Sequence, residues 1–269
     1  MTSEKLPVVA AIPNYNMSKG LARLLPQVLE QRYDHIYVLD DCSTDDSESV
    51  VISFGKKVTF LKNKVNQGAG GARNLIIPHL KEVSLIHFMD ADISLVSKNN
   101  PEIIRRLGID ESTGFVGGLV FESDGKQSIW NYGQRLSITE SSRSIIQSMN
   151  KSWSRLFTSK PHPADKPRKR DTFWVLERSF VIRSDTLEKL GGLDPLIREH
   201  DIQPLALKAH KAGLVSRFDP SFSVKSHQDI DVRPYNRLGS MVKAELYIIK
   251  KYGSWLHWFF PFLNKKRPQ

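Results

Sequence analysis

The sequence has little that would mark a secreted or membrane-spanning protein. Cys42 is the one cysteine in 269 residues, so an intramolecular disulfide is excluded and a cysteine-rich zinc site is not expected. No apolar run approaches the roughly 18 residues of a membrane span. The N-terminus lacks the basic and apolar regions of a signal peptide. We therefore expect a folded, cytoplasmic protein with a large core.

The chain is rich in positive charge, with a formal net charge of +10. Such a surface attracts nucleic acid, anionic lipid headgroups or phosphorylated substrates. The densest cluster lies in residues 160–170, where five Lys and Arg residues alternate with three prolines. Prolines exclude a regular helix, so this segment is expected to be a solvated loop or a flap.

Short apolar runs and helix-like stretches alternate over the first hundred residues. The runs are Val8–Ile12, Ile36–Leu39, Val58–Leu61 and Leu85–Met89. Leucines recur at helical spacing from Leu21 to Leu29, with Pro26 expected to kink or shorten that helix, and Ser43 is a plausible N-cap for the next. This alternation predicts an α/β fold with a mainly parallel sheet flanked by helices.

Two carboxylates, in Asp90-Ala91-Asp92, follow the fourth run directly. They would lie at the carboxyl end of a buried strand, where open α/β sheets bind ligands. Aspartate oxygens suit Mg²⁺ or Mn²⁺, which complete their shells with water and substrate phosphates. Chance or a solvated loop explains most D-x-D triplets, so the rest of the chain must decide.

Polar residues also follow the other three runs. They are Pro13–Asn16, Asp40–Asp45 and Asn66–Asn74. Each segment alone has the composition of a turn or helix cap. Because parallel strands end at one edge of a sheet, the four segments together predict a polar site at that edge.

With these four segments the chain resembles the family 2 glycosyltransferases of GT-A fold. That family carries I-P-x-Y-N, V-D-D-x-S-x-D, N-x-G-x-x-x-A-R-N and D-x-D in this order, and its G-G-F-D resembles Gly191-Gly192-Leu193-Asp194. The resemblance implies roles in binding the nucleotide, with Arg73 near the diphosphate and Asp90 near the ribose. The residues it places in that site are Pro13, Tyr15, Asp40, Asp41, Gly68, Arg73 and Asp90.

These residue types suit the implied roles. A carboxylate accepts the N3–H of uracil or thymine, an aromatic ring such as Tyr15 stacks on a base, and Arg73 pairs with phosphate. For Arg73 an ordinary ion pair is the alternative. Gly68-Ala69-Gly70-Gly71 superficially resembles a dinucleotide-binding turn, but Arg73 occupies its third glycine position. A dehydrogenase is therefore disfavoured.

The resemblance also implies a catalytic base in the second half of the chain. The family commonly has E-D before a helix, whereas this chain has Glu199-His200-Asp201. Asp201 is the first choice as base and Glu199 the second. A capping role at the following helix is the alternative for Asp201.

Three further residues complete the predicted site. The resemblance implies that Asp90, Asp92 and His227 hold a divalent metal, Mn²⁺ or Mg²⁺, although a lone histidine is more often structural. Trp174 is the best candidate for stacking on an acceptor sugar, with core packing as the alternative.

The C-terminal segment has a different composition. Aromatic and apolar residues from Trp255 to Leu263 precede Lys265, Lys266 and Arg267, as in segments that lie on anionic membranes. Packing on the catalytic domain, or an oligomer contact, is the alternative. We predict a GT-A catalytic domain over residues 1–230, with a nucleotide half near 1–115 and an acceptor half near 116–230. A helical tail would occupy residues 231–269.

Taken together, the residues and the resemblance predict an inverting, metal-dependent glycosyltransferase. It would use a UDP- or dTDP-sugar and act on a glycan or lipid-linked acceptor in polysaccharide biosynthesis of the cell envelope. A cytoplasmic location is expected, with peripheral contact to the inner membrane face left open. The alternative is a nucleotide-sugar-binding protein without turnover. Nucleic-acid binding explains none of the strand-end residues.

Overall fold

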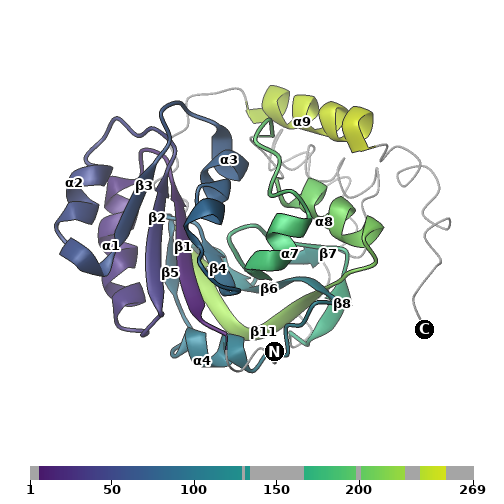
Figure 1. Cartoon of the computed structure of the whole chain (residues 1–269), viewed down its shortest axis with the longest axis horizontal. Coiled ribbons are helices and arrows are strands. Elements are labelled where there is room, and N and C mark those ends of the chain that lie inside the picture. The colour runs from purple at the N-terminus through teal and green to yellow at the C-terminus, as the bar shows by residue number, and fades with distance from the viewer. Residues whose placement is uncertain (1–5, 129–130, 134–166, 198–200, 228–236, 253–269) are drawn as a thin grey trace.

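The computed structural model of the chain describes residues 6–128, 131–133, 167–197, 201–227 and 237–252. Helices cover both faces of a central sheet, and α9 lies across one side of the molecule (Figure 1). The strand order is β3-β2-β1-β4-β10-β6-β11-β5, and β8 pairs with β11. The predicted α/β architecture is therefore confirmed.

The first four strands are parallel, as the alternating pattern predicts. They are β1 (Val8–Asn14), β2 (His35–Asp40), β3 (Thr59–Lys62) and β4 (Leu85–Met89). Alternate residues of β1 face opposite sides of the sheet, so Val8 and Ala10 enter one hydrophobic cluster and Val9 and Ala11 the other. Because the four strands are parallel, their carboxyl ends reach the same edge of the sheet.

The second half makes the sheet mixed. Strand β10 (Ser179–Arg183) runs antiparallel between β4 and β6 (Thr113–Phe121), and β11 (Val215–Ser226) pairs parallel with β6. The shorter strands β5 (Ile93–Leu95) and β8 (Arg170–Thr172) run antiparallel to β11. A separate two-stranded sheet joins β7 (Tyr132–Gly133) and β9 (Trp174–Val175). The expectation of mainly parallel strands thus holds for the first half.

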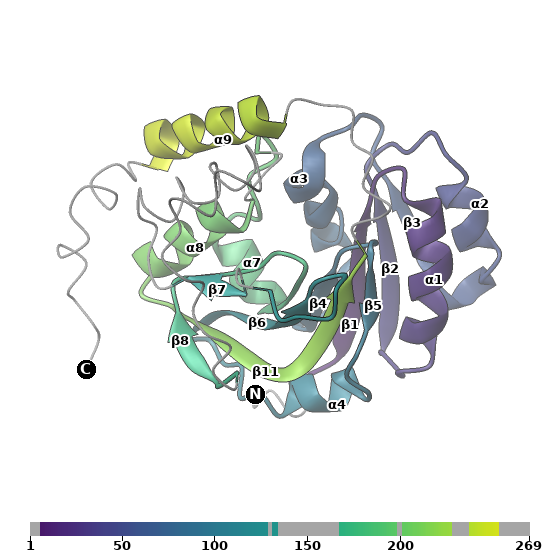
Figure 2. The same ribbon diagram turned by 180° about the vertical axis from the view of Figure 1, so that it is seen from behind.

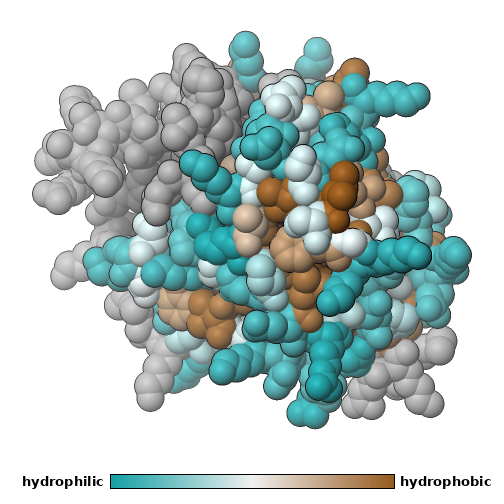
Figure 3. Space-filling view, turned by 90° about the vertical axis from the view of Figure 1, so that its left-hand side faces the viewer, coloured by the Kyte–Doolittle hydropathy of each residue, from teal (hydrophilic) through white to brown (hydrophobic). Residues whose placement is uncertain are grey.

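One layer of helices covers the face of the sheet on which the side chains of Val8 and Ala10 lie. It contains α1 (Ser18–Leu29), α2 (Ser47–Ile52) and α4 (Asn100–Arg105). Pro26 lies inside α1, which still continues to Leu29, so the expected shortening does not occur. Figure 3 views this side, where hydrophilic side chains surround smaller hydrophobic areas.

The opposite layer contains α3 (Gly68–Asn74), α7 (Ser184–Lys189), α8 (Ile202–Lys211) and α9 (Arg237–Tyr252). Seen from behind, α8 and α9 lie on the side away from α1 and α2 (Figure 2). In the part of the chain that the structure describes, short 3₁₀ turns span Gly55–Lys57 and Ile77–His79. Among the described residues, no helix has the length and apolar character needed to cross a membrane.

The start of α2 differs from the prediction. Ser43 was expected to cap a helix, but α2 begins at Ser47 with Asp46 preceding it. The hydroxyl of Ser43 instead accepts hydrogen bonds from Asn14 Nδ2 at 3.1 Å and from the Asn16 amide at 2.8 Å. Ser43 therefore connects the ends of β1 and β2 rather than starting a helix.

Candidate functional site

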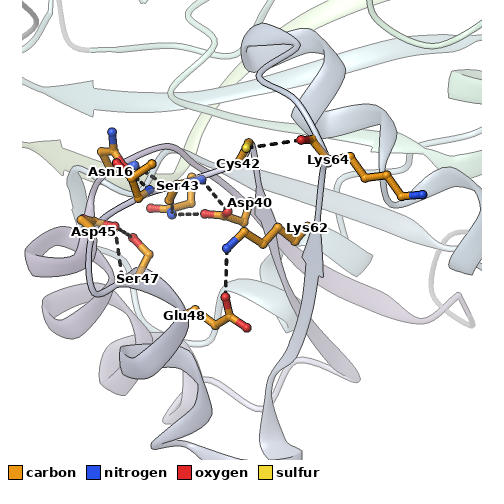
Figure 4. A network of polar contacts seen from close by, with 11 residues as sticks. Asn16, Asp40, Cys42, Ser43, Asp45, Ser47, Glu48, Lys62 and Lys64 are labelled. Atoms are coloured by element: carbon orange, nitrogen blue, oxygen red, sulfur yellow. Dashed lines mark hydrogen bonds and ion pairs between the residues drawn. The ribbon is translucent and has the colours of Figure 1, made fainter.

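The ends of β1 and β2 are joined by a polar network that centres on Asp40 (Figure 4). Asp40 is fully buried. Its Oδ1 accepts from Asn14 Nδ2 at 2.7 Å, and its Oδ2 accepts from the Ser43 amide at 2.8 Å. Buried carboxylates need such donors, since an unpaired buried charge is costly. The structure thus places Asp40 at the end of β2, where it bonds to the end of β1 and to the segment that follows β2.

Two non-glycine residues of this network have positive φ angles, Asn16 at 55° and Cys42 at 66°. A side chain at positive φ is strained and is held there by its surroundings. Asn16 Oδ1 accepts from the Thr44 amide at 2.8 Å, and Cys42 Sγ lies 3.5 Å from the Lys64 carbonyl oxygen. Both strand ends of this network thus contain a residue in the left-handed region, as functional sites commonly do.

Asp41 caps the first turn of α3. Its Oδ1 accepts from Asn63 Nδ2 at 2.9 Å and from the Gln67 amide at 2.8 Å, and its Oδ2 accepts from the Gly68 amide at 2.7 Å. These bonds satisfy backbone donors that a helix start leaves unpaired. Of the two interpretations of Asn66–Asn74, a turn or a helix cap, the structure shows the start of a helix that a buried acid positions.

The other predicted nucleotide residues lie beside this cap. Tyr15 follows β1 and is 49% exposed, so its ring is available to a ligand. Pro13 is buried within β1, and Gly68 is partly exposed at the start of α3. One exposed ring and two acid-bearing strand ends thus lie at a common edge of the sheet.

Arg73 joins the two halves of the chain. Its side chain is 1% exposed, and its Nη2 donates to Asp90 Oδ1 at 2.7 Å and to the Glu177 carbonyl oxygen at 3.3 Å. Its Nη1 donates to Asp201 Oδ2. Asp90 follows β4 and Asp201 precedes α8, so one guanidinium holds the predicted base beside the D-x-D triplet.

Asp201 does not cap the helix that it precedes. Asp201 occupies the N-cap position of α8, but its own side chain makes no capping hydrogen bond there. The residue is 2% exposed. Burial raises the pKa of its carboxyl to about 6, with the charge of Arg73 acting in the opposite direction. The capping alternative is therefore wrong, and the other predicted base, Glu199, lies outside the described residues.

The sequence reasoning missed Arg178, which lies between β9 and β10. Its Nη1 is 3.5 Å from Asp92 Oδ2 and also donates to Ser226 Oγ. The Arg178 carbonyl oxygen accepts from the Asp90 amide at 3.1 Å. Each carboxylate of the D-x-D triplet thus has its own arginine. No sequence signal pointed to Arg178, because only the antiparallel β4–β10 pair brings it there.

The side chains of the predicted metal ligands are each held by another partner. His227 donates its backbone amide to the Asp92 carbonyl oxygen at 2.8 Å, while its Nε2 is 2.8 Å from Ser94 Oγ. Within the described ranges, no three acid, histidine or cysteine side chains form a group that could hold a metal ion. Two carboxylates and an imidazole are nevertheless a suitable donor set for Mn²⁺. The donor types therefore suit a cation, while in this structure Asp90, Asp92 and His227 are bonded to Arg73, Arg178 and Ser94.

Two glycines allow helices to approach the site closely. A Cβ on Gly20 of α1 would lie 2.4 Å from the Ala91 carbonyl oxygen, inside the D-x-D triplet. A Cβ on Gly70 of α3 would lie 2.6 Å from the Asp194 carbonyl oxygen. Such distances exclude a larger residue without a backbone shift. The triplet and the Gly191–Asp194 turn are therefore positioned by direct backbone contact.

The Gly191–Asp194 turn also connects α3 with α9. Asn74, at the end of α3, bonds the Leu193 backbone through both ends of its amide, at 2.8 and 2.9 Å. The buried Asp194 accepts from Lys251 Nζ at 2.9 Å and from the Tyr252 hydroxyl at 2.5 Å. The helix that carries Arg73 is thus linked to the C-terminal helix through one turn.

Trp174 lies in β9 and is 9% exposed. It belongs to the hydrophobic cluster on the α8 side, where a Cβ on Gly133 would meet its indole ring at 2.2 Å. A ring packed so closely offers little surface to a sugar. Its acceptor role stays a prediction, and core packing describes its position here.

The tail and the basic cluster are described only in part. Ile248 and Ala244 of α9 are buried against the α8 side of the sheet. Residues 253–269, including Trp255 to Arg267, lie outside the described residues, as do residues 160–166 of the basic cluster. Arg170 of that cluster belongs to β8 and lies over the Tyr132 ring at 4.9 Å.

Known proteins of similar structure are sugar-transferring enzymes that share this fold. GalNAc-T7 with UDP, GalNAc and Mn²⁺ matches 98% of this chain and 52% of its own, with a TM-score of 0.64 and 14% identity. The mannosyltransferase PcManGT from Pyrobaculum calidifontis, with GDP-Man and Mn²⁺, matches 94% of this chain and 73% of its own at a TM-score of 0.56 and 15% identity. S. aureus TarS 1-349 with UDP-GlcNAc matches 87% of this chain and 61% of its own at a TM-score of 0.54 and 16% identity. The fold is therefore GT-A, as predicted.

A sequence relative is the Escherichia coli UDP-Glc:alpha-D-GlcNAc-diphosphoundecaprenol beta-1,3-glucosyltransferase WfgD. It is 30% identical over 103 residues, which cover 33% of this chain and 40% of WfgD. The chain thus spans about half or less of GalNAc-T7 and of WfgD. The family model described as "Glycosyl transferase family 2" matches residues 9–172, which include Tyr15, Asp41, Arg73 and the D-x-D triplet. From this match over more than half its length, the chain belongs to glycosyl transferase family 2.

Proposed function

We propose that this protein transfers a sugar from a nucleoside diphosphate donor to an acceptor hydroxyl with inversion at the anomeric carbon. The observation that carries the proposal is the pairing of Arg73 with both Asp90 and Asp201. It brings a phosphate-binding cation, an acid of the D-x-D triplet and a candidate base into one place. A purely structural ion pair would need only one of these acids.

We propose UDP or dTDP as the nucleotide of the donor. The exposed ring of Tyr15 would stack on the base, with Pro13 and Gly68 beside it. Asp41 would accept the N3–H of uracil or thymine while it continues to cap α3, since a carboxylate has about four acceptor sites and three are used by the bonds described. Asp40 would support this pocket from beneath.

We propose Asp201 as the base and Glu199 as the alternative. The acceptor hydroxyl would give its proton to the carboxylate as its oxygen attacks the anomeric carbon, and the bond to the diphosphate would break. Arg73 would keep Asp201 ionised and oriented, and would also face the leaving diphosphate. No covalent intermediate is needed for inversion.

A divalent cation, Mn²⁺ or Mg²⁺, is part of the proposal because of the charge at this edge. Among the described residues, five carboxylates surround two guanidinium groups; the acids are Asp90, Asp92, Asp201, Glu122 and Glu177, and the bases are Arg73 and Arg178. The excess of negative charge repels a diphosphate. Asp90, Asp92 and His227 would hold a cation, which neutralises the charge that develops on the leaving group.

The acceptor is proposed to be a glycan or a lipid-linked sugar, as in polysaccharide biosynthesis for the cell envelope. WfgD, whose name includes a diphosphoundecaprenol acceptor, supports a lipid-linked one. A cytoplasmic position, with peripheral contact to the inner membrane face through the tail of residues 231–269, would suit such an acceptor. An oligomer contact is the alternative role of this tail. Residues 1–230 are proposed as the catalytic domain.

Donor binding is tested by thermal shift with UDP-, dTDP- and GDP-sugars in the presence of Mn²⁺. A ligand at one hundred times its Kd stabilises the folded state by about 2.7 kcal/mol, which raises the melting temperature measurably. We expect a shift with UDP- or dTDP-sugars that Tyr15→Ala reduces. The absence of any shift with the whole panel would contradict the proposal.

A nucleotide-sugar-binding protein without turnover is the second candidate, and one observation favours it. Asp201 is 2% exposed and engaged with Arg73, whereas a base must reach the acceptor hydroxyl. Donor hydrolysis or transfer in the presence of Mn²⁺ separates the two candidates. Donor binding without either reaction would support the second.

A further inference from the structure

Arg178 is held against the D-x-D triplet by a rigid part of the fold. Its Nη1 donates to Ser226 Oγ, and Ser226 is fully buried at the end of β11, where it pairs with Ile93 of β5. The same Nη1 lies 3.5 Å from Asp92 Oδ2. A positive charge therefore already lies beside the carboxylate that is proposed to hold the metal.

The surroundings of Arg178 are strongly acidic. Charges of Asp92, Asp90, Glu177 and Glu122 together raise its pKa above the usual value, against the effect of burial. The side chain is 22% exposed, so it is reached from solvent. A guanidinium in this position is always charged, and it offers planar donors that match phosphate oxygens.

We propose that Arg178 is a displaceable counter-ion of Asp92. A divalent cation replaces Arg178 at Asp92, and the released guanidinium of Arg178 then pairs with the diphosphate of the donor. This inference rests on the proposed function of the site. A divalent ion beside Asp92 repels the guanidinium, and the diphosphate supplies the negative charge that the guanidinium has lost. Cation and donor binding become coupled through one side chain.

The first test measures Mn²⁺ binding to the whole protein without nucleotide, by electron paramagnetic resonance of free Mn²⁺. Arg178→Gln removes the competing charge, and we expect the Kd for Mn²⁺ to fall at least about tenfold. Ser226→Ala keeps the charge but removes the hydrogen bond that holds it, and we expect a smaller change in the same direction. Asp92→Asn should abolish binding in each background.

Arg183→Gln is the matched control. Arg178 immediately precedes β10, and Arg183 is the last residue of that strand. The buried side chain of Arg183 pairs with Asp185 at 2.6 and 3.0 Å. Its substitution removes the same charge far from the triplet along the same strand. We expect the Mn²⁺ Kd of this variant to equal that of the unaltered protein. Equal Kd values for Arg178→Gln and Arg183→Gln would overturn the inference.

The second test measures coupling. The ratio of the Mn²⁺ Kd without UDP to that with UDP should be large in the unaltered protein and at least about fivefold smaller in Arg178→Gln. An unchanged ratio would overturn the role at the diphosphate. The same titrations measure UDP binding, which tests the proposed function. If UDP binds but Arg178→Gln changes neither the Mn²⁺ Kd nor the ratio, the inference about Arg178 is refuted and the proposed function is not.

Discussion

Arg73 and Asp201 are 128 positions apart in the sequence, yet the guanidinium of one donates directly to the carboxylate of the other. Both side chains are almost completely buried. Removing Arg73 would leave Asp201 as an uncompensated buried charge, which typically costs about 3–5 kcal/mol. The pair therefore fixes where the second half of the chain meets the nucleotide half.

The base assignment predicts that Asp201→Asn lowers turnover at least about a hundredfold, because general-base catalysis contributes roughly 10²–10⁴-fold. Donor affinity should change little, since Arg73 keeps its bond to Asp90. Steady-state kinetics and donor titration measure the two effects. If Glu199→Gln gives this result and Asp201→Asn does not, Glu199 is the base.

The pH dependence of kcat/KM follows from the raised pKa of Asp201. Its carboxyl titrates at about 6, so the protonated form predominates below that pH and cannot accept a proton. We expect kcat/KM to be constant above about pH 7 and to fall about tenfold per unit below 6. A profile that stays flat down to pH 5 would be inconsistent with Asp201 as base.

Asp92→Asn should abolish metal-dependent nucleotide binding without unfolding the protein, because the change removes a charge and almost no volume. Nucleotide titrations with Mn²⁺ and with EDTA measure the difference. Asp124→Asn, an exposed acid in the turn after β6, is the control and should leave both titrations unchanged. Equal nucleotide affinity of Asp92→Asn and the unaltered protein in Mn²⁺ would contradict the metal assignment.

Asp41→Asn should lower the free energy of unfolding by about 1 kcal/mol, the usual worth of a helix cap. Both carboxylate oxygens of Asp41 accept hydrogen bonds, and the NH₂ group that replaces one of them in asparagine cannot accept one. Urea denaturation measures the loss. Asp46→Asn is matched to it, because Asp46 precedes α2 without any side-chain capping bond and its substitution should have almost no effect.

Two deletions separate the roles of the tail. Removing residues 255–269 should leave donor binding intact and weaken binding to anionic vesicles, since each of Lys265, Lys266 and Arg267 contributes roughly 1 kcal/mol near a negative surface. Removing residues 237–269 also takes away Ile248 and the partners of Asp194, so we expect a much lower melting temperature. Vesicle binding that the shorter deletion does not change would refute the membrane contact.

Much of the first half could be predicted from sequence, because the signals there are local. The residues of β4 match the predicted run Leu85–Met89, and β1 and β2 differ from theirs by one or two residues at an end. Strand-end acids reach a common edge whenever consecutive strands are parallel. Ser43 was misread because its hydroxyl serves the β1–β2 network, and a hydroxyl before a helical pattern looks the same in either role.

The partners of the site residues could not be predicted. Arg178 reaches Asp92 because β10 runs antiparallel to β4, a pairing that has no local signature in sequence. Asp201 was weighed between base and cap because the sequence does not reveal its ion pair with Arg73. Both outcomes depend on contacts between residues far apart in the chain, which only the folded sheet determines.

The long separation of Arg73 from Asp201 has a consequence for synthesis of the protein. When the first 190 residues have left the ribosome, β1 to β4 and α3 are complete, but Asp201 and Ser226 are not yet available. Arg73 then lacks one of its acids, and Arg178 lacks the hydroxyl that holds it. Contacts of such sequence separation form late and slow the folding reaction. We expect the site to be the last part of the nascent chain to become ordered.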